Sequence, residues 1–178
     1  FYWERVESSR NFANKIWNAS RFIMMNLEDK TVTEPADLNE LCFEDKWILS
    51  KLNTVIREVT DNMDKYELGI AVQKVYDFLW DELCDWYIEM AKVRLWKADE
   101  NPKAANDALW TLRTALTEGL KLLHPYMPFI TEEIYCTLLP EEESIMISDW
   151  PVFQEAWSFP EAEKAVESFK EAIRGIRN

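Results

Sequence analysis

Apolar residues recur every three or four positions along most of this 178-residue chain, and few helix-breaking residues interrupt them. Such spacing places apolar side chains on one face of an α-helix. Only three glycines and seven prolines occur, which also favours helices. The pattern predicts an all-α protein, an antiparallel bundle of four long helices followed by short C-terminal helical elements.

The predicted helices begin and end at recognisable signals. Pro35, in a polar loop, prevents the first helix from continuing. Asn101 followed by Pro102 is typical of a helix start, and that helix should end at His124, because a residue before proline is disfavoured in helical conformation. Long helices are therefore expected over residues 3–27, about 44–63, about 67–90 and 102–123, a short helix between positions 128 and 140, an extended stretch over 144–151, and a charged helix over 161–178.

Each of these helices carries an apolar stripe that should face the core. The expected stripe is Ala13, Ile16, Ser20, Ile23 and Leu27 in the first helix; Leu68, Val72, Val75, Leu79, Leu83, Trp86 and Met90 in the third; and Ala165, Val166, Phe169, Ile173 and Ile176 in the last. The third stripe is close to a heptad pattern, which suits tight antiparallel packing.

The charge of the chain is strongly acidic but unevenly distributed. The formal net charge is −13, which argues against nonspecific binding of nucleic acid, because that binding depends on many cations. Residues 8–27 contain Arg10, Lys15 and Arg21 and no acidic residue, so this segment carries +3 and the rest of the chain −16. The first helix therefore differs electrostatically from everything that follows it.

Candidate residues for catalysis or metal binding are few. Cys42, Cys84 and Cys136 lie far apart in apolar patterns, and we expect free thiols in a reducing compartment rather than a zinc site. The single histidine, His124, is expected to be structural, and Asp81 and Asp85, one helical turn apart, are expected on a solvated face. We find no nucleophile motif, no phosphate loop, no membrane span and no export signal.

The outer face of the first helix is the most informative feature. At about 100° per residue, a polar and aromatic set lies opposite the apolar stripe: Asn11, Asn14, Lys15, Asn18, Arg21, Phe22 and Met25. Amides that read base edges, a ring for stacking and cations for phosphates are what recognition of unpaired RNA bases requires. The alternative is a solvated face on which a neighbouring helix or the polar loop covers Phe22.

Four blocks, in this order and spacing, resemble the helical anticodon-binding domain of the valyl-tRNA synthetase family. They are RNFANKIWNASRF, DKWILSKLN, FLWDELCDWYIEMAK and LLHPYMPFITEEIY, and together they extend over nearly the whole chain. The last block alone would also fit the isoleucyl and leucyl relatives, whereas the first indicates the valyl enzyme. Besides those relatives, an acidic helical protein-interaction module remains an alternative.

The resemblance implies a fragment of a cytoplasmic, monomeric enzyme. The family's HIGH-like and KMSKS-like motifs are not found, so the fragment should not charge tRNA; it needs no cofactor, and ATP and Mg belong to the parent's catalytic domain. The chain begins at Phe1 in a sequence that already looks helical, which suits this expectation. We expect residues 1–160 to form the anticodon-binding bundle and residues 161–178 to begin a helix leading to a missing extension.

The resemblance also implies a partner and a set of contacts. The partner is the anticodon loop of a valine tRNA, with the remaining synthetase domains beside it. Valine codons share their first two letters, so the second and third anticodon bases are the informative ones. The expected contacts are Lys15 with phosphate or base edges, Phe22 stacking, Asn11, Asn14 and Asn18 with base edges, Arg10 and Arg21 as backbone anchors, and Asp85 as an acceptor for exocyclic amino groups, with Trp17 assigned to packing.

Overall fold

The computed structural model describes residues 2–177, apart from the side chains at positions 5 and 177, and has no β-strand within that range. The all-α prediction is confirmed. The helices are α1 (Trp3–Leu27), α2 (Phe43–Asp64), α3 (Leu68–Asp77), α4 (Ile88–Trp96), α5 (Pro102–Leu123), α6 (Pro128–Leu138) and α7 (Pro160–Arg177), with a π-helix η2 (Phe78–Tyr87) and 3-10 turns η1 (Leu38–Glu40), η3 (Ile145–Ile147) and η4 (Glu155–Trp157).

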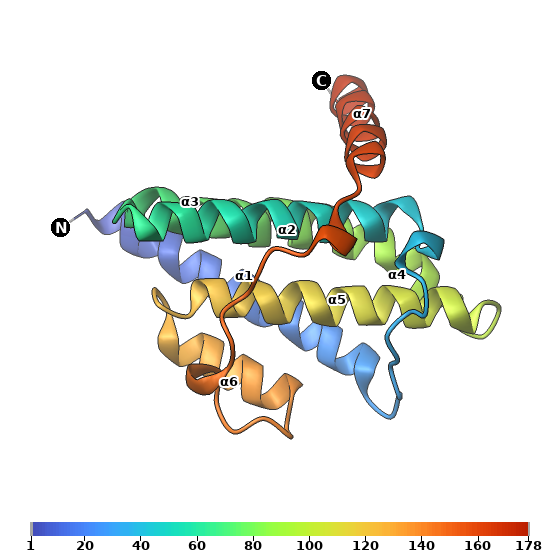
Figure 1. Cartoon of the computed structure of the whole chain (residues 1–178), viewed down its shortest axis with the longest axis horizontal. Helices are drawn as coiled ribbons and strands as arrows, with labels where there is room; N and C mark the ends of the chain where they lie inside the picture. The colour runs from blue at the N-terminus through green and yellow to red at the C-terminus, as the bar shows by residue number, and fades with distance from the viewer. Residues whose placement is uncertain (1, 178) are drawn as a thin grey trace.

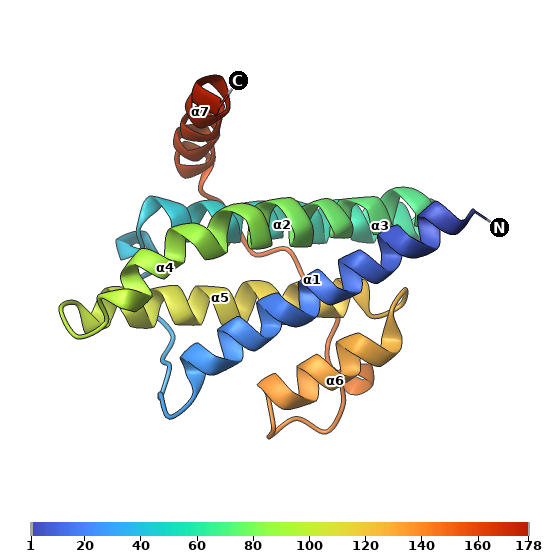
Figure 2. The same cartoon turned by 180° about the vertical axis from the view of Figure 1, so that it is seen from behind.

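The helices form a bundle from which the last one projects. In Figures 1 and 2, α2 runs beside the continuous rod of α3, η2 and α4, and α5 lies below this pair. The first helix crosses the bundle obliquely and contacts η2, α5 and α6. After α6 the chain runs back over the bundle to α7, which packs against α2 and projects beyond the edge of the bundle (Figure 1).

Local signals in the sequence fix both ends of α5. The Asn101 side-chain oxygen accepts a hydrogen bond from the Ala104 N–H at 3.1 Å, and Pro102 is the first residue of α5, as predicted. That helix ends at Leu123, immediately before His124. The short helix predicted after position 128 is α6. The stretch predicted to be extended is instead interrupted by the 3-10 turn η3.

The third predicted helix differs from expectation in its centre. Ten residues form the π-helix η2, in which each turn holds more residues than in an α-helix. One row of buried positions follows a strict spacing of four rather than a heptad, and Phe78 and Ile88 are buried beside it: the row is Ala71, Val75, Leu79, Leu83, Tyr87, Ala91 and Leu95. In a pure α-helix each step of four turns about 40° too far, so the wider turns of η2 keep this stripe facing the core. Leu68, Val72, Trp86 and Met90 are consequently only half-buried or exposed.

The first helix buries a slightly different stripe from the predicted one. Ile16, Ser20 and Ile23 are buried as expected, and the Ser20 hydroxyl donates to the Ile16 carbonyl at 2.7 Å. Phe12 is buried as well, whereas the predicted Ala13 and Leu27 are half-buried. The buried stripe of α7 also differs from the predicted one. Ala162 and Val166 are buried, whereas Ala165, Phe169 and Ile176 are exposed.

A buried charge network ties α2 to the far end of the long rod. The Asp45 carboxylate is fully buried and accepts a hydrogen bond from the Tyr87 hydroxyl at 2.5 Å. The Arg94 guanidinium donates to both of its oxygens, at 2.7 and 2.5 Å. Such two-pronged pairing satisfies a buried carboxylate and fixes its geometry. The network therefore sets the position of η2 and α4 against α2.

Candidate nucleic-acid interface

The outer face of α1 presents a row of exposed polar side chains. Asn11, Asn14, Asn18 and Arg21 are all exposed, as predicted, and Met25 lies 69% exposed beyond them. Within the described part of the chain, the three amides make no side-chain hydrogen bond and Arg21 makes no ion pair. These four residues, the α1 row, are consequently available to a ligand.

Lys15 is not an exposed member of this row. Its side chain is 23% exposed, and its ammonium lies 2.5 Å from an Asp85 carboxylate oxygen on η2. The ammonium also sits 3.7 Å from the centroid of the Trp80 ring. The structure thus brings together two of the predicted site residues, Lys15 and Asp85, as an ion pair. The cation is held in place rather than free in solvent.

Phe22 also differs from its predicted exposure. The ring is half-buried and packs against the core, and the Lys92 ammonium lies 5.5 Å from its centroid. A neighbouring helix therefore covers part of Phe22, which was the alternative interpretation. Trp17, expected to pack, is instead 41% exposed. On the helical wheel Trp17 lies between Ala13 and Arg21, next to the outer face, which was a signal for this exposure.

Three stacked rings join α1 to the rod. Phe12 and Tyr76 have ring centroids 4.6 Å apart, and Tyr76 and Trp80 have centroids 5.5 Å apart. Aromatic pairs of this kind add to the free energy of packing beyond the area that they bury. Because Trp80 also underlies Lys15, the stack supports the cation from below.

The remaining charged candidates lie around this centre. Arg10 is exposed and pairs with Glu7 at 3.0 Å within α1. Asp81 and Asp85 are exposed on η2, as expected. Partial burial raises the pKa of Asp81, and the neighbouring carboxylates of Asp77 and Asp85 raise it further. The rod therefore presents negative charge beside the cationic helix, and Asp85 already neutralises Lys15.

The three cysteines are free thiols, as expected, and all are half-buried. Burial raises the pKa of the Cys84 thiol to about 12, with Asp85 adding to the effect and Lys15 opposing it. Burial likewise raises the pKa of Cys42 far above its usual range, and the Asp45 carboxylate adds to this. Thiolates are the reactive form of cysteine, so these two residues are poorly suited to nucleophilic chemistry.

At pH 8 we expect Cys84 to react with iodoacetamide about a thousandfold more slowly than an ordinary cysteine. A raised pKa means that the thiolate appears only at higher pH, so the rate should climb about tenfold per pH unit up to about pH 11. Mass spectrometry of the alkylated chain measures the rate, and the urea-unfolded chain is the control in which all three thiols should react alike. Full-rate labelling of folded Cys84 would contradict the expectation.

The single histidine joins three elements of the fold. Its Nδ1 lies 2.7 Å from the Thr131 hydroxyl on α6, and its Nε2 lies 2.8 Å from the Met146 sulfur on η3. The contacts of His124 thus connect elements of the fold, which is the structural role expected for it. Among the described residues we find no group of three or more His, Cys, Asp or Glu side chains placed to hold a metal ion. In the same part of the chain, every helix is too short or too polar to cross a membrane.

Comparison with known proteins gives a consistent assignment. Residues 45–178 match the family model described as the anticodon-binding domain of tRNA ligase. The chain is 55% identical over 178 residues to the valine--tRNA ligase of Clostridium tetani, covering all of this chain and 20% of that protein. It is 57% identical over 175 residues to the valine--tRNA ligase of Clostridium perfringens, covering 98% of this chain and 20% of that protein. The chain thus spans about a fifth of the length of these curated relatives.

A solved structure shares the fold. The LeuRS of Agrobacterium radiobacter K84, determined as a ternary complex with tRNA and LeuAMS, aligns with a TM-score of 0.58 and 18% identity, over 85% of this chain and 17% of that chain. The family match, together with similarity to two valine enzymes over at least 98% of this chain, shows that the chain belongs to the family of anticodon-binding domains of tRNA ligases and corresponds to that domain of the valine--tRNA ligases.

Proposed function

We propose that this chain binds the anticodon loop of a valine tRNA through the α1 row. In this proposal it is one part of a cytoplasmic, monomeric synthetase whose other domains carry out ATP-dependent aminoacylation. ATP and magnesium would act in those other domains. The observation that carries the proposal is the set of three unpaired amides and one unpaired arginine on a single exposed face, in a chain of this family.

The chemistry of the row suits unstacked bases. Each amide donates and accepts, so it can pair with the edge of any base, and the guanidinium of Arg21 can reach a phosphate or a base. Lys15 lies beside the row, and its ammonium has two N–H donors in addition to the one directed at Asp85. The aromatic stack holds α1 rigidly against the rod, so the donors and acceptors keep a fixed spacing.

The proposal is tested by titrating the chain with two anticodon stem–loops. One carries a valine anticodon, and the other differs only in its middle anticodon base. Because a base-edge contact discriminates by about 1–3 kcal/mol, we expect the altered stem–loop to bind about 5- to 150-fold more weakly. Equal affinity for the two RNAs would contradict the proposal and favour a protein-interaction role.

A further inference from the structure

A small cavity on α5 shares no residue with the α1 row. It has a volume of about 210 Å³ and is lined by Arg113, Thr114, Thr117, Glu118, Leu139 and Glu141. The first four of these residues belong to α5, and the last two follow the end of α6. Most ligand pockets enclose about 300–1,000 Å³. A molecule that fills this cavity must therefore be small.

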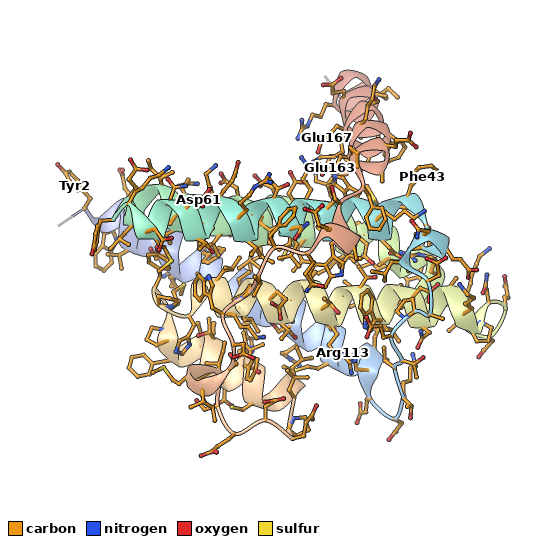
Figure 3. All side chains as sticks on the ribbon, in the orientation of Figure 1. Tyr2, Phe43, Asp61, Arg113, Glu163 and Glu167 are labelled. Carbon is orange, nitrogen blue, oxygen red and sulfur yellow. The ribbon has the colours of Figure 1, made fainter. Side chains whose placement is uncertain are left out.

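Arg113 supplies the cavity with a cation that has no partner. The residue is half-buried and, within the described part of the chain, makes neither an ion pair nor a side-chain hydrogen bond. Figure 3 shows it on the side of α5 that faces away from α2. The chain contains 33 acidic residues against 20 lysines and arginines, so carboxylates are plentiful. All five N–H donors of this guanidinium are nevertheless free to hold an oxyanion.

Two threonine hydroxyls on the same wall are also unpaired. On other helices, the hydroxyls of Ser20 and Thr137 donate to the carbonyl four positions earlier, each at 2.7 Å. Among the described residues, the hydroxyls of Thr114 and Thr117 make no such bond. Thr117 is 9% exposed, so its hydroxyl is desolvated without compensation. Since a helical threonine has two χ1 rotamers, this hydroxyl can turn toward a polar ligand.

The two carboxylates of the lining differ in what they offer a ligand. Glu118 lies 3.0 Å from the Lys121 ammonium, and the two side chains are 19% and 16% exposed, so this pair carries no net charge. Glu141 is exposed and has no ion pair within the described residues. The cavity thus presents one free positive group, at Arg113, and one free negative group, at Glu141.

This charge pattern selects the class of ligand. A simple anion held by Arg113 would be repelled by Glu141, and a simple cation held by Glu141 would be repelled by Arg113. A molecule that carries both charges satisfies both groups. In a free α-amino acid the carboxylate and the ammonium are attached to the same carbon atom, and a short apolar side chain can lie against Leu139.

We propose that this cavity binds a small free α-amino acid. The ligand's carboxylate accepts hydrogen bonds from Arg113 and from the hydroxyls of Thr114 and Thr117, and its ammonium donates to Glu141. The inference goes beyond the proposed RNA contact and does not depend on it. A bound amino acid joins α5 to the segment after α6, so saturating ligand should raise the melting temperature of the chain.

The first test is an NMR titration of the ¹⁵N-labelled chain with L-alanine. So small a ligand binds weakly, and we expect a Kd of about 1–10 mM. The shifted amide signals should cluster at Thr114, Thr117 and Glu141. Acetate, which lacks the ammonium, should bind about two- to fivefold more weakly. Methylammonium, which lacks the carboxylate, should bind at least about tenfold more weakly.

A second test removes each charged group of the cavity in turn. Arg113→Met keeps the apolar stem but loses the guanidinium, so L-alanine should bind at least about tenfold more weakly. Arg174→Met makes the same change at an exposed position of α7, outside the cavity, and should bind as wild type does. In Glu141→Gln the preference for L-alanine over acetate should disappear. Glu142→Gln, the neighbouring control, should keep it.

A third test distinguishes binding from a structural role of the buried hydroxyl. Thr117→Val replaces the hydroxyl with a methyl group of similar shape. Because that hydroxyl has no hydrogen-bond partner among the described residues, the free energy of unfolding should not fall without ligand. The affinity for L-alanine should nevertheless fall about two- to tenfold. A loss of stability without a loss of affinity would show that the hydroxyl serves the fold alone.

Three results would overturn the proposal. One is the absence of saturable shifts up to about 100 mM L-alanine. Another is L-alanine binding that Arg113→Met leaves unchanged. The third is equal binding of acetate and L-alanine by the wild-type chain, which would assign the cavity to a simple carboxylate. The stem–loop titration uses none of these residues, so the two proposals fail independently.

Discussion

Replacing Arg94 with methionine is expected to lower the free energy of unfolding by about 3–5 kcal/mol. The Asp45 carboxylate is fully buried, and both of its oxygens accept hydrogen bonds from the charged guanidinium of Arg94. Without the guanidinium, the Tyr87 hydroxyl is the one side-chain partner left to this carboxylate among the described residues, and a buried charge without sufficient partners is costly. Urea unfolding followed by tryptophan fluorescence measures the loss.

A matched substitution separates the network from a general loss of charge. Arg113→Met changes the same residue type on α5, where the side chain is half-buried and has no ion pair within the described residues (Figure 3). We expect that change to stay within about 0.5 kcal/mol. A loss below about 1 kcal/mol in Arg94→Met would show that Asp45 finds other partners and that the network does not anchor the rod.

The network matters for the site because of where it lies. Asp45 and Tyr87 meet at the end of η2, and η2 carries Trp80 and Asp85, which hold Lys15. If this network were lost and η2 became an ordinary α-helix, the residues that follow would turn to another face. Arg94→Met is therefore also expected to weaken binding of the valine stem–loop at temperatures where the chain is still folded.

The π-helix could not be predicted from the sequence, whereas the helix ends could. Asn101 with Pro102, and His124 before Pro125, act through bonds between near neighbours, so their effect is visible in the sequence. The hydrogen-bond pattern of η2 instead depends on which face tertiary packing buries. Gly119 on α5 illustrates this, because a Cβ there would lie 2.6 Å from the Leu79 side chain of η2. Such a close approach joins residues far apart in the chain.

The same distinction between local interactions and tertiary packing explains which site residues could be placed from the sequence. Helical geometry correctly placed the amides and Arg21 on the outer face of α1, because their exposure depends on the helix alone. Lys15 and Phe22 lie together at one edge of that face, where the rod contacts them. Asp85, the partner of Lys15, is 70 positions away, and no local pattern specifies such a pairing.

Lys15→Met is expected to weaken binding of the valine stem–loop by about 1–3 kcal/mol and to reduce the slope of log affinity against log salt by about one. The ammonium is held by Asp85 and Trp80, so binding would cost little side-chain entropy. Methionine keeps the apolar stem over Trp80 but removes the charge. Because the ion pair is partly exposed, the free energy of unfolding should change by less than about 1 kcal/mol.

Lys30→Met is the matched control, since Lys30 is exposed in the loop after α1 and lies beyond the row. It should leave both the affinity and the discrimination between stem–loops unchanged. If Lys15→Met also left the salt slope unchanged, Lys15 would serve only to neutralise Asp85. The expected result instead makes Asp85 a positioning residue for Lys15. Its negative charge lowers the attraction of Lys15 for any phosphate, but it also fixes the ammonium where one particular RNA conformation meets it. Specificity therefore rises as nonspecific affinity falls.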